Sequence, residues 1–246
     1  MKEKNSLFQL AVVVSALGFF VDVYDLLLFG IIRKPSLADL GLSPAEIVAQ
    51  GELIISVQMI GLLAGGILWG VIGDKKGRLN VLFGSILIYS IANILNGMVT
   101  DIPQYVAMRF VAGVGLAGEL GAGITLISEL LPKEKRGMAA AMIASFGILG
   151  AVTAYFMKEA FFWRTCYFIG GAMGLLLLVL RIRVHESNLY AHLKAQRIGR
   201  GNFFMFFTNK DRFLRYARCI LIGLPAWYII GVLVTFFRSI WRGFRY

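Results

Sequence analysis

The chain of 246 residues is 58% hydrophobic, with a mean hydropathy of +0.74, whereas a soluble domain is usually about 45–50% apolar. Its formal net charge of +11 is not accompanied by a helix-turn-helix, a zinc-ligand spacing or an RNA-binding aromatic motif, so we expect the basic residues to contact anionic lipid rather than nucleic acid. The only two cysteines, Cys166 and Cys219, form no CxxC pair, and we expect no disulfide framework, metal or cofactor.

Continuous apolar runs long enough to cross a bilayer recur along the chain, without the alternation of barrel strands. They predict an all-α integral membrane protein. The predicted spans cover residues 7–32, 51–73, 79–99, 104–131, 137–157, 163–183 and 217–237. We therefore expect a six-span N-terminal domain over 1–184, a basic cytoplasmic loop over 185–216, and a seventh span with a short tail over 217–246.

The distribution of Lys and Arg predicts the orientation of these spans. Most basic residues fall on one side when the N-terminus is placed in the cytoplasm, including Lys75, Lys76, Arg136 and Arg181. Because cytoplasmic loops are enriched in Lys and Arg, the sequence predicts a multi-pass protein of the plasma (inner) membrane with a cytoplasmic N-terminus. The basic tail after the seventh span does not follow this rule.

Two aspartates interrupt the first span, in the stretch GFFVDVYDLLLFG over residues 18–30. Asp22 lies near the middle of the span, and Asp25 lies on the same helical face, about 4.5 Å further along the axis. A charged Asp at mid-membrane costs roughly 2.5–3.5 kcal/mol on insertion scales. The presence of two such costly residues in one span predicts that they have a functional role.

The fourth span, RFVAGVGLAGELGAGITL, carries Glu119 near its middle and Arg109 closer to its outer end. Its GVGLAG stretch matches the G-x-G-x-x-G pattern, but a dinucleotide site needs a strand before the glycines, and these glycines lie inside a membrane run. The small residues at positions 113, 117 and 121 instead predict close packing against another helix.

We expect Asp22, Asp25, Glu119 and Arg109 to face one polar cavity. Burial disfavours the charged form of a carboxylate, so such a group can take up and release a proton near neutral pH. In this hypothesis Asp22 and Glu119 carry or relay protons, and Arg109 neutralises them or binds an anionic solute. The alternative is a structural set in which the acids pair with Arg109 and exchange nothing.

The loop between the second and third spans reads GVIGDKKGRLNVL and contains Gly70, Asp74, Gly77 and Arg78. Gly70 can allow close approach of a helix, and Gly77 a tight turn. Asp74 can cap a helix N-terminus, and Arg78 can hold a carboxylate through two hydrogen bonds.

This G-x-x-x-D-x-x-G-R spacing resembles the loop signature of the major facilitator superfamily of secondary transporters. A second segment, LISELLPKEKRG, is similar to the S-E-x-x-P-x-x-x-R-G segment that closes the fourth span in sugar porters and metabolite symporters. The resemblance implies a cytoplasmic ion-pair network that latches two halves of a transporter. Its members would be Asp74, Arg78, Glu129 and Arg136.

The first span also resembles that of phosphate:proton symporters, which carry a similar Asp-x-Tyr-Asp. The fourth span departs from them, because Gly118-Glu119-Leu120-Gly121 stands where they have Gly-Asp-Tyr-Pro. The resemblance covers residues 7 to about 237, the first half of such a transporter. It implies inverted three-helix repeats and proton-coupled symport of an organic acid, a sugar-like metabolite or phosphate by alternating access, not enzyme activity. The alternative is a truncated, non-transporting remnant, or a membrane interaction protein that needs a partner half or a second copy.

Overall fold

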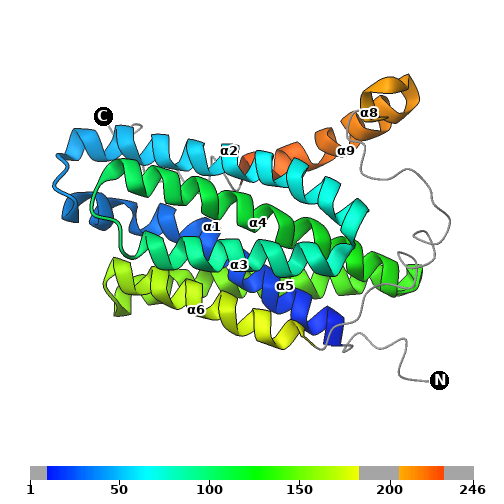
Figure 1. The fold of residues 1–246 in the computed structure, drawn as a ribbon, viewed down its shortest axis with the longest axis horizontal. Helices are drawn as coiled ribbons and strands as arrows, with labels where there is room; N and C mark the ends of the chain where they lie inside the picture. Colours follow the sequence, from blue (N-terminus) through cyan, green and yellow to red (C-terminus); the bar gives the residue numbers. More distant parts are fainter. Residues whose placement is uncertain (1–9, 183–204, 230–246) are drawn as a thin grey trace. The chain divides into compact units, whose positions relative to one another are not determined.

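The computed structural model describes residues 10–182 and 205–229. This part of the chain is helical and contains no strand (Figure 1). The helices are α1 (Leu10–Asp39), α2 (Pro44–Lys76), α3 (Arg78–Asn96), α4 (Ile102–Leu130), α5 (Lys133–Ala160), α6 (Trp163–Arg181), α8 (Met205–Thr208) and α9 (Lys210–Tyr228). Helices α1–α6 are long and apolar enough to cross a membrane, so the expected all-α membrane fold is confirmed.

Helix α1 is longer than the predicted span, because it continues past Ile32 and through Pro35 to Asp39. Proline removes one backbone N–H donor from a helix, and in the same turn the Ser36 hydroxyl donates to the carbonyl of Arg33 at 3.1 Å. The helix therefore extends beyond the point at which the apolar run ends.

Helix α2 begins at Pro44, before the predicted start at residue 51. The backbone N–H of Ser43 donates to Oε2 of Glu46 at 2.8 Å, as in the capping box that starts many helices. Proline suits the first helical position, where its missing N–H has no helical partner. Polar capping residues therefore add two turns that hydropathy does not detect.

The six long helices pack with an internal two-fold pattern. Helix α1 packs against α5, and α4 packs against α2. If α1, α2 and α3 are exchanged with α4, α5 and α6, the α1–α5 contact becomes the α4–α2 contact. The α3–α6 contact stays the same. This pairing has the symmetry expected of inverted three-helix repeats.

Glycines bring α2 and α4 into close contact. A Cβ atom added at Gly61 would collide with the carbonyl oxygen of Phe110, and one at Gly113 with that of Gln58. Positions 113 and 117 of the predicted small-residue stripe lie in this contact, since a Cβ at Gly65 would lie 3.0 Å from that of Ala117. Gly121 faces open space, so the third position of the stripe does not take part.

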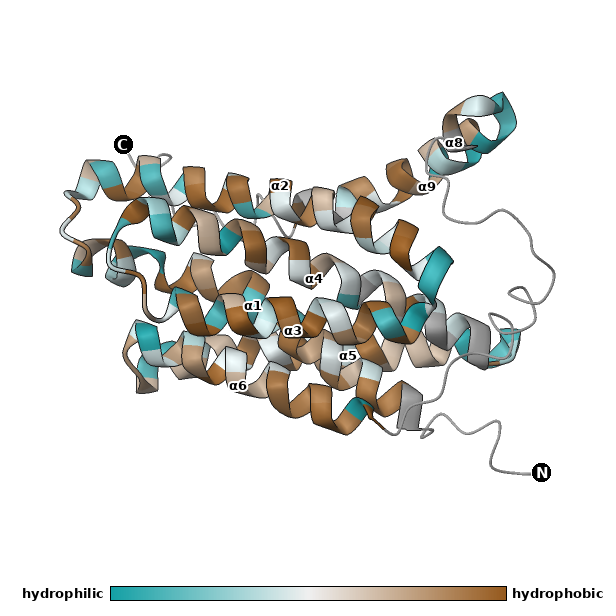
Figure 2. Ribbon diagram, in the orientation of Figure 1, coloured by the Kyte–Doolittle hydropathy of each residue, from teal (hydrophilic) through white to brown (hydrophobic). Residues whose placement is uncertain are grey.

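The long helices are mostly hydrophobic along their lengths (Figure 2), and many large apolar side chains of the six-helix unit are exposed. Leu63 is 69% exposed, Ile148 66% and Leu176 63%. Monomeric soluble proteins rarely expose large apolar surface, whereas side chains that face lipid are apolar. The surface therefore agrees with a bundle that lies in a bilayer.

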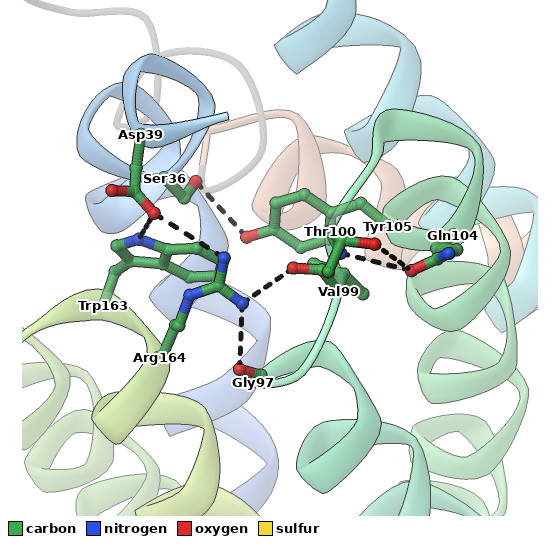
Figure 3. A network of polar contacts seen from close by, with 9 residues as sticks. All are labelled: Ser36, Asp39, Gly97, Val99, Thr100, Gln104, Tyr105, Trp163 and Arg164. Atoms are coloured by element: carbon green, nitrogen blue, oxygen red, sulfur yellow. Dashed lines mark hydrogen bonds and ion pairs between the residues drawn. The ribbon is translucent and has the colours of Figure 1, made fainter. Parts of the chain in front are cut away.

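The unit has two ends, defined by its turns. The Gly77 end contains residue 77 and residues 131–132, and the Asp39 end contains residues 40–43, 97–101 and 161–162. At the Asp39 end, Arg164 donates to the carbonyls of Gly97 and Val99, at 3.2 and 2.7 Å (Figure 3). Its guanidinium also lies 3.6 Å from Asp39, which accepts a hydrogen bond from the Trp163 indole at 3.1 Å. Helix α6 is thus tied to α1 and to the end of α3.

Helices α8 and α9 belong to a separate compact unit that begins at Asn202. The side chain of Asn209 accepts a hydrogen bond from the N–H of Asp211 at 2.9 Å, which caps the first turn of α9. Helix α9 begins at Lys210, within the predicted loop over 185–216, and the predicted domain boundaries stay a prediction. Part of that loop and the end of the predicted seventh span lie outside the described residues.

Candidate functional site

A stripe of small and polar residues runs along the buried face of α1. Ser15, Gly18, Asp22 and Asp25 follow at intervals of three, four and three, which places them on one side of the helix. The three polar side chains are all buried. Because α1 packs against α4, α5 and α6, the stripe brings both aspartates into the interior of the bundle.

A matching stripe on α4 carries Arg109 and Glu119. They lie ten residues apart, or about 15 Å along the helix axis, and both are buried. Helix α4 runs from the Asp39 end to the Gly77 end, opposite to α1. Arg109 therefore lies at the level of Asp25, and Glu119 lies nearer the Gly77 end.

Arg109 and Asp25 form a closed, buried ion pair. Nη1 of Arg109 donates to Oδ1 of Asp25 and Nη2 donates to Oδ2, each at 3.1 Å, and both side chains are 0% exposed. Nη1 also donates to Oδ1 of Asn93 at 3.4 Å. The guanidinium carbon lies 5.8 and 5.5 Å from the ring centres of Phe29 and Tyr167, at cation–π distance. The pair is sealed from solvent.

A second buried pair joins Glu119 to Arg181, the last residue of α6. Nη1 of Arg181 donates to Oε2 of Glu119, and Nη2 donates to Oε1. Nη1 also donates to the carbonyl of Leu82 on α3 at 3.2 Å. Arg181, which was counted among the basic residues of the cytoplasmic side, lies at the end of the predicted span over 163–183, and its side chain is 1% exposed. It belongs to the interior with the acids.

Asp22 is the remaining acid of this group. Its Oδ2 is buried and has no hydrogen-bond partner among the described residues. Asp22 and Glu119 line a small, water-sized cavity of about 10 Å³, whose other walls are Ser15, Phe19, Gly123, Ile124 and Ile143. We call Asp22, Asp25, Glu119, Arg109 and Arg181 the acid–arginine cluster. With all its groups ionised it carries three negative and two positive charges.

The expectation of three acids and Arg109 around one cavity is therefore corrected. Asp22 and Glu119 line the cavity, whereas Asp25 and Arg109 do not. A second arginine, which was not among the predicted site residues, neutralises Glu119. Helix-face analysis could have found it, because Arg181 continues the buried stripe of Gly170, Gly174 and Leu177 on α6 at helical spacing.

The loop signature lies at the Gly77 end. Gly77 has a φ of 102°, a conformation that glycine adopts readily, and it separates α2 from α3 as a one-residue turn. Arg78 donates to Oδ1 of Asp74 at 2.8 Å. A Cβ at Gly70 would meet nothing within 4 Å, so the close helix approach expected there is not found among the described residues.

The second motif contributes differently from the expectation. Nε of Arg136 donates to the backbone carbonyl of Leu131 at 3.0 Å, across the α4–α5 turn. The side chain of Glu129 lies outside the described part of the structure. The four-residue ion-pair network therefore stays a prediction, of which the structure contains the Asp74–Arg78 pair.

Within residues 10–182 and 205–229, no group of three or more His, Cys, Asp or Glu side chains is placed to hold a metal ion. The polar chemistry of the described chain is therefore that of carboxylates and guanidinium groups in an apolar interior. Such an arrangement can bind and release protons or hold charged groups of a solute.

Comparison with known proteins places the chain in a known family. The family model of the Major Facilitator Superfamily matches residues 10–244. The niacin transporter NiaP of Acinetobacter baylyi is 32% identical over 72% of the chain, and the sialic acid transporter NanX of Escherichia coli is 31% identical over 70%. A structure of the proton:xylose symporter XylE superposes with a TM-score of 0.68 over 76% of the chain, at 19% identity.

These relatives are longer than this chain. The matched part corresponds to 40% of NiaP, 42% of NanX and 47% of the XylE chain. The chain thus spans about half the length of the proteins that it matches. The likeness to XylE concerns the fold, which in both contains the six-helix unit.

Proposed function

Because the chain belongs to the major facilitator superfamily, we propose that it couples movement of a small solute to protons by alternating access, with the fold of a transporter's N-terminal half. The relatives named above are transporters and not enzymes. The observation that supports proton coupling is the unequal number of acids and arginines in the acid–arginine cluster. Two acids have arginine partners, and Asp22 has none among the described residues.

Asp22 is the proton-binding group in this proposal. An unpaired carboxylate in a low-dielectric interior is costly, and one added positive charge neutralises the cluster. The cavity gives Asp22 a place to exchange a proton. Asp25 and Arg109 stay paired and join α1 to α4.

The solute in this proposal is a small organic acid or a sugar-like metabolite. NiaP and NanX are named for niacin and sialic acid, and XylE for xylose. Both buried arginines of the acid–arginine cluster already hold carboxylates. An anionic solute must therefore displace one of those carboxylates or find its positive partner outside the cluster.

The orientation in this proposal places the Gly77 end in the cytoplasm of a cell with a plasma (inner) membrane. Lys75, Lys76, Lys133 and Lys135 lie at that end, and basic residues favour the cytoplasmic side. The excess of basic residues at the Gly77 end remains when the buried Arg181 is not counted.

Replacing Asp22 by asparagine is expected to abolish solute-driven proton entry. The test reconstitutes the chain in liposomes with a pH-sensitive dye inside and adds nicotinate, sialic acid, benzoate or xylose. The wild type should acidify the interior with one of these solutes, and Asp22→Asn should lose at least 90% of the rate. Glu159→Gln, which removes half of an exposed ion pair, should retain it. Equal rates in Asp22→Asn and wild type would remove Asp22 from the mechanism.

A second candidate is a half that acts only with a partner half or a second copy. The match to about half of each relative favours it. In that case the chain alone moves no protons with any solute, and co-reconstitution with a separately produced second half of a relative restores the signal. Activity of the chain alone at a density of one copy per vesicle would exclude this candidate.

We extend the proposal to the Gly77 end, where Asp74, Arg78, Glu129 and Arg136 act as a latch. Breaking the Asp74–Arg78 ion pair with Asp74→Asn and Arg78→Gln is expected to loosen the α2–α3 turn. A reporter cysteine at Val81, which is 1% exposed and packs beside Gly73, should then react with a maleimide several-fold faster. The matched control is Lys158→Gln with Glu159→Gln, an exposed pair at the opposite end. Unchanged labelling would argue against the latch.

A further inference from the structure

Arg181 holds Glu119 against the backbone of α1. The pair lies so close to Gly18 that a Cβ there would collide with Oε1 of Glu119 and with Nη2 of Arg181. Gly18 precedes Asp22 by four residues on the same face of α1. One guanidinium therefore lies next to two carboxylates, one bound to it and one a helical turn away.

Two of the buried side-chain atoms that lack a hydrogen-bond partner lie in this neighbourhood. Oδ2 of Asp22 and Nε of Arg181 are both buried, and neither has a partner among the described residues. An unpaired acceptor and an unpaired donor are each costly in an apolar interior. In this structure Arg181 is hydrogen-bonded to Glu119, and no described residue forms an ion pair with Asp22.

We propose that Arg181 is a positioning residue that reserves the coupled proton for Asp22, an inference that rests on the proposed function. While Arg181 holds Glu119, Glu119 stays in the ion pair, and Asp22 keeps its proton. When the O–H bond of Asp22 breaks and the proton leaves through the cavity, the new carboxylate competes with Glu119 for the guanidinium. Release of the proton therefore changes the electrostatic attraction between α1, which carries Asp22, α4, which carries Glu119, and α6, which carries Arg181.

The charged and titratable groups around Asp22 are few. Asp25 lies on α1, Glu119 on α4 and Arg181 on α6, and the buried Tyr89 of α3 also interacts with Asp22. Helix α5 lines the cavity with Ile143, and its charged residues lie at its two ends. Arg181 is therefore the one cation of the described residues that acts on Asp22 directly.

The test follows protonated carboxyl groups by infrared difference spectroscopy, with the full chain in liposomes and the pH changed in steps. We expect one titrating carboxyl band in the wild type, and no such band in Asp22→Asn. This arm tests the proposed function alone. A wild-type band that persists in Asp22→Asn, or no band at all, would overturn the assignment of the proton to Asp22 and the inference with it.

The second arm tests Arg181. In Glu119→Gln the guanidinium loses its partner and becomes available to Asp22, so the Asp22 band should disappear at a pH about one unit lower, since a close opposite charge has an effect of this size. Adding Arg181→Gln should return the midpoint to the wild-type value or above. Adding Arg181→Lys instead should keep it low, because the charge is retained.

A merely structural arginine predicts a different result. In that case the Asp22 band titrates with the same midpoint in Glu119→Gln and in the double variant that adds Arg181→Gln. This outcome would overturn the inference, whereas the assignment of the proton to Asp22, which the Asp22→Asn variant tests, would still stand. The double variant removes both charges of the pair, so it leaves no buried charge unpaired and should fold. Protection of the buried Cys166 from a thiol reagent reports folding of each variant.

Discussion

Replacing Arg109 by methionine is expected to lower the free energy of unfolding by about 3–5 kcal/mol, the usual effect of leaving one member of a buried ion pair alone. Asp25 accepts two hydrogen bonds from Arg109, and both side chains are fully buried. Methionine fills much of the same volume but donates nothing. The carboxylate of Asp25 then remains in an apolar interior without a donor or a counter-ion.

The reverse change, Asp25→Asn, should be destabilising for the same reason, because Arg109 stays charged. The double variant Asp25→Asn with Arg109→Met should recover most of the loss, since neither charge remains. Such recovery measures the coupling between the two residues. Two losses that simply add would show that each residue acts through separate contacts.

Cys166 provides the measurement. It is buried, whereas Cys219 is exposed and can be replaced by serine. In the Cys219→Ser background, a thiol-reactive dye reports the temperature at which the six-helix unit opens. Glu159→Gln is the matched control, because the Lys158–Glu159 pair is exposed and exposed pairs contribute about 0–1 kcal/mol. A shift for Arg109→Met no larger than that of this control would contradict the expectation.

Hydropathy was sufficient to predict the helices but not all of their ends. The apolar runs lead directly to α1–α6, because in a bilayer only a helix or a closed barrel satisfies every backbone group. The starts and ends depend on polar residues instead. Glu46 accepts the Ser43 N–H at the start of α2, and Ser36 supports the turn around Pro35 in α1.

The composition of the site was partly predictable, but its pairing was not. Asp22, Asp25, Arg109 and Glu119 are conspicuous because charge is rare inside a span. Which acid pairs with which arginine depends on the relative depth of three helices, which the sequence does not state. Arg181 was missed because a basic residue at the end of a span is normally a loop residue. Arg181 instead lies on the buried face of α6, which places it among the residues of the site.

Two glycines of α4 look alike in the sequence, but only one of them lies in the contact with α2. Gly113 and Gly121 both belong to the small-residue stripe of α4, yet a Cβ at Gly113 would fall on the carbonyl oxygen of Gln58, and one at Gly121 would meet nothing within 4 Å. The obstruction at Gly113 is backbone, which cannot rotate away as a side chain can. Only movement of α2 away from α4 can make room.

Gly113→Ala is therefore expected to destabilise the six-helix unit by about 1–3 kcal/mol, as overpacking does in other cores. Gly121→Ala should be neutral or stabilising by up to about 1 kcal/mol, because alanine favours helix more than glycine does. The same Cys166 assay measures both. Because the two variants share helix, residue type and propensity gain, their difference isolates the cost of separating α2 from α4. Equal stability of the two variants would mean that α2 moves freely at this contact, and the glycines would then not be what holds the pair together.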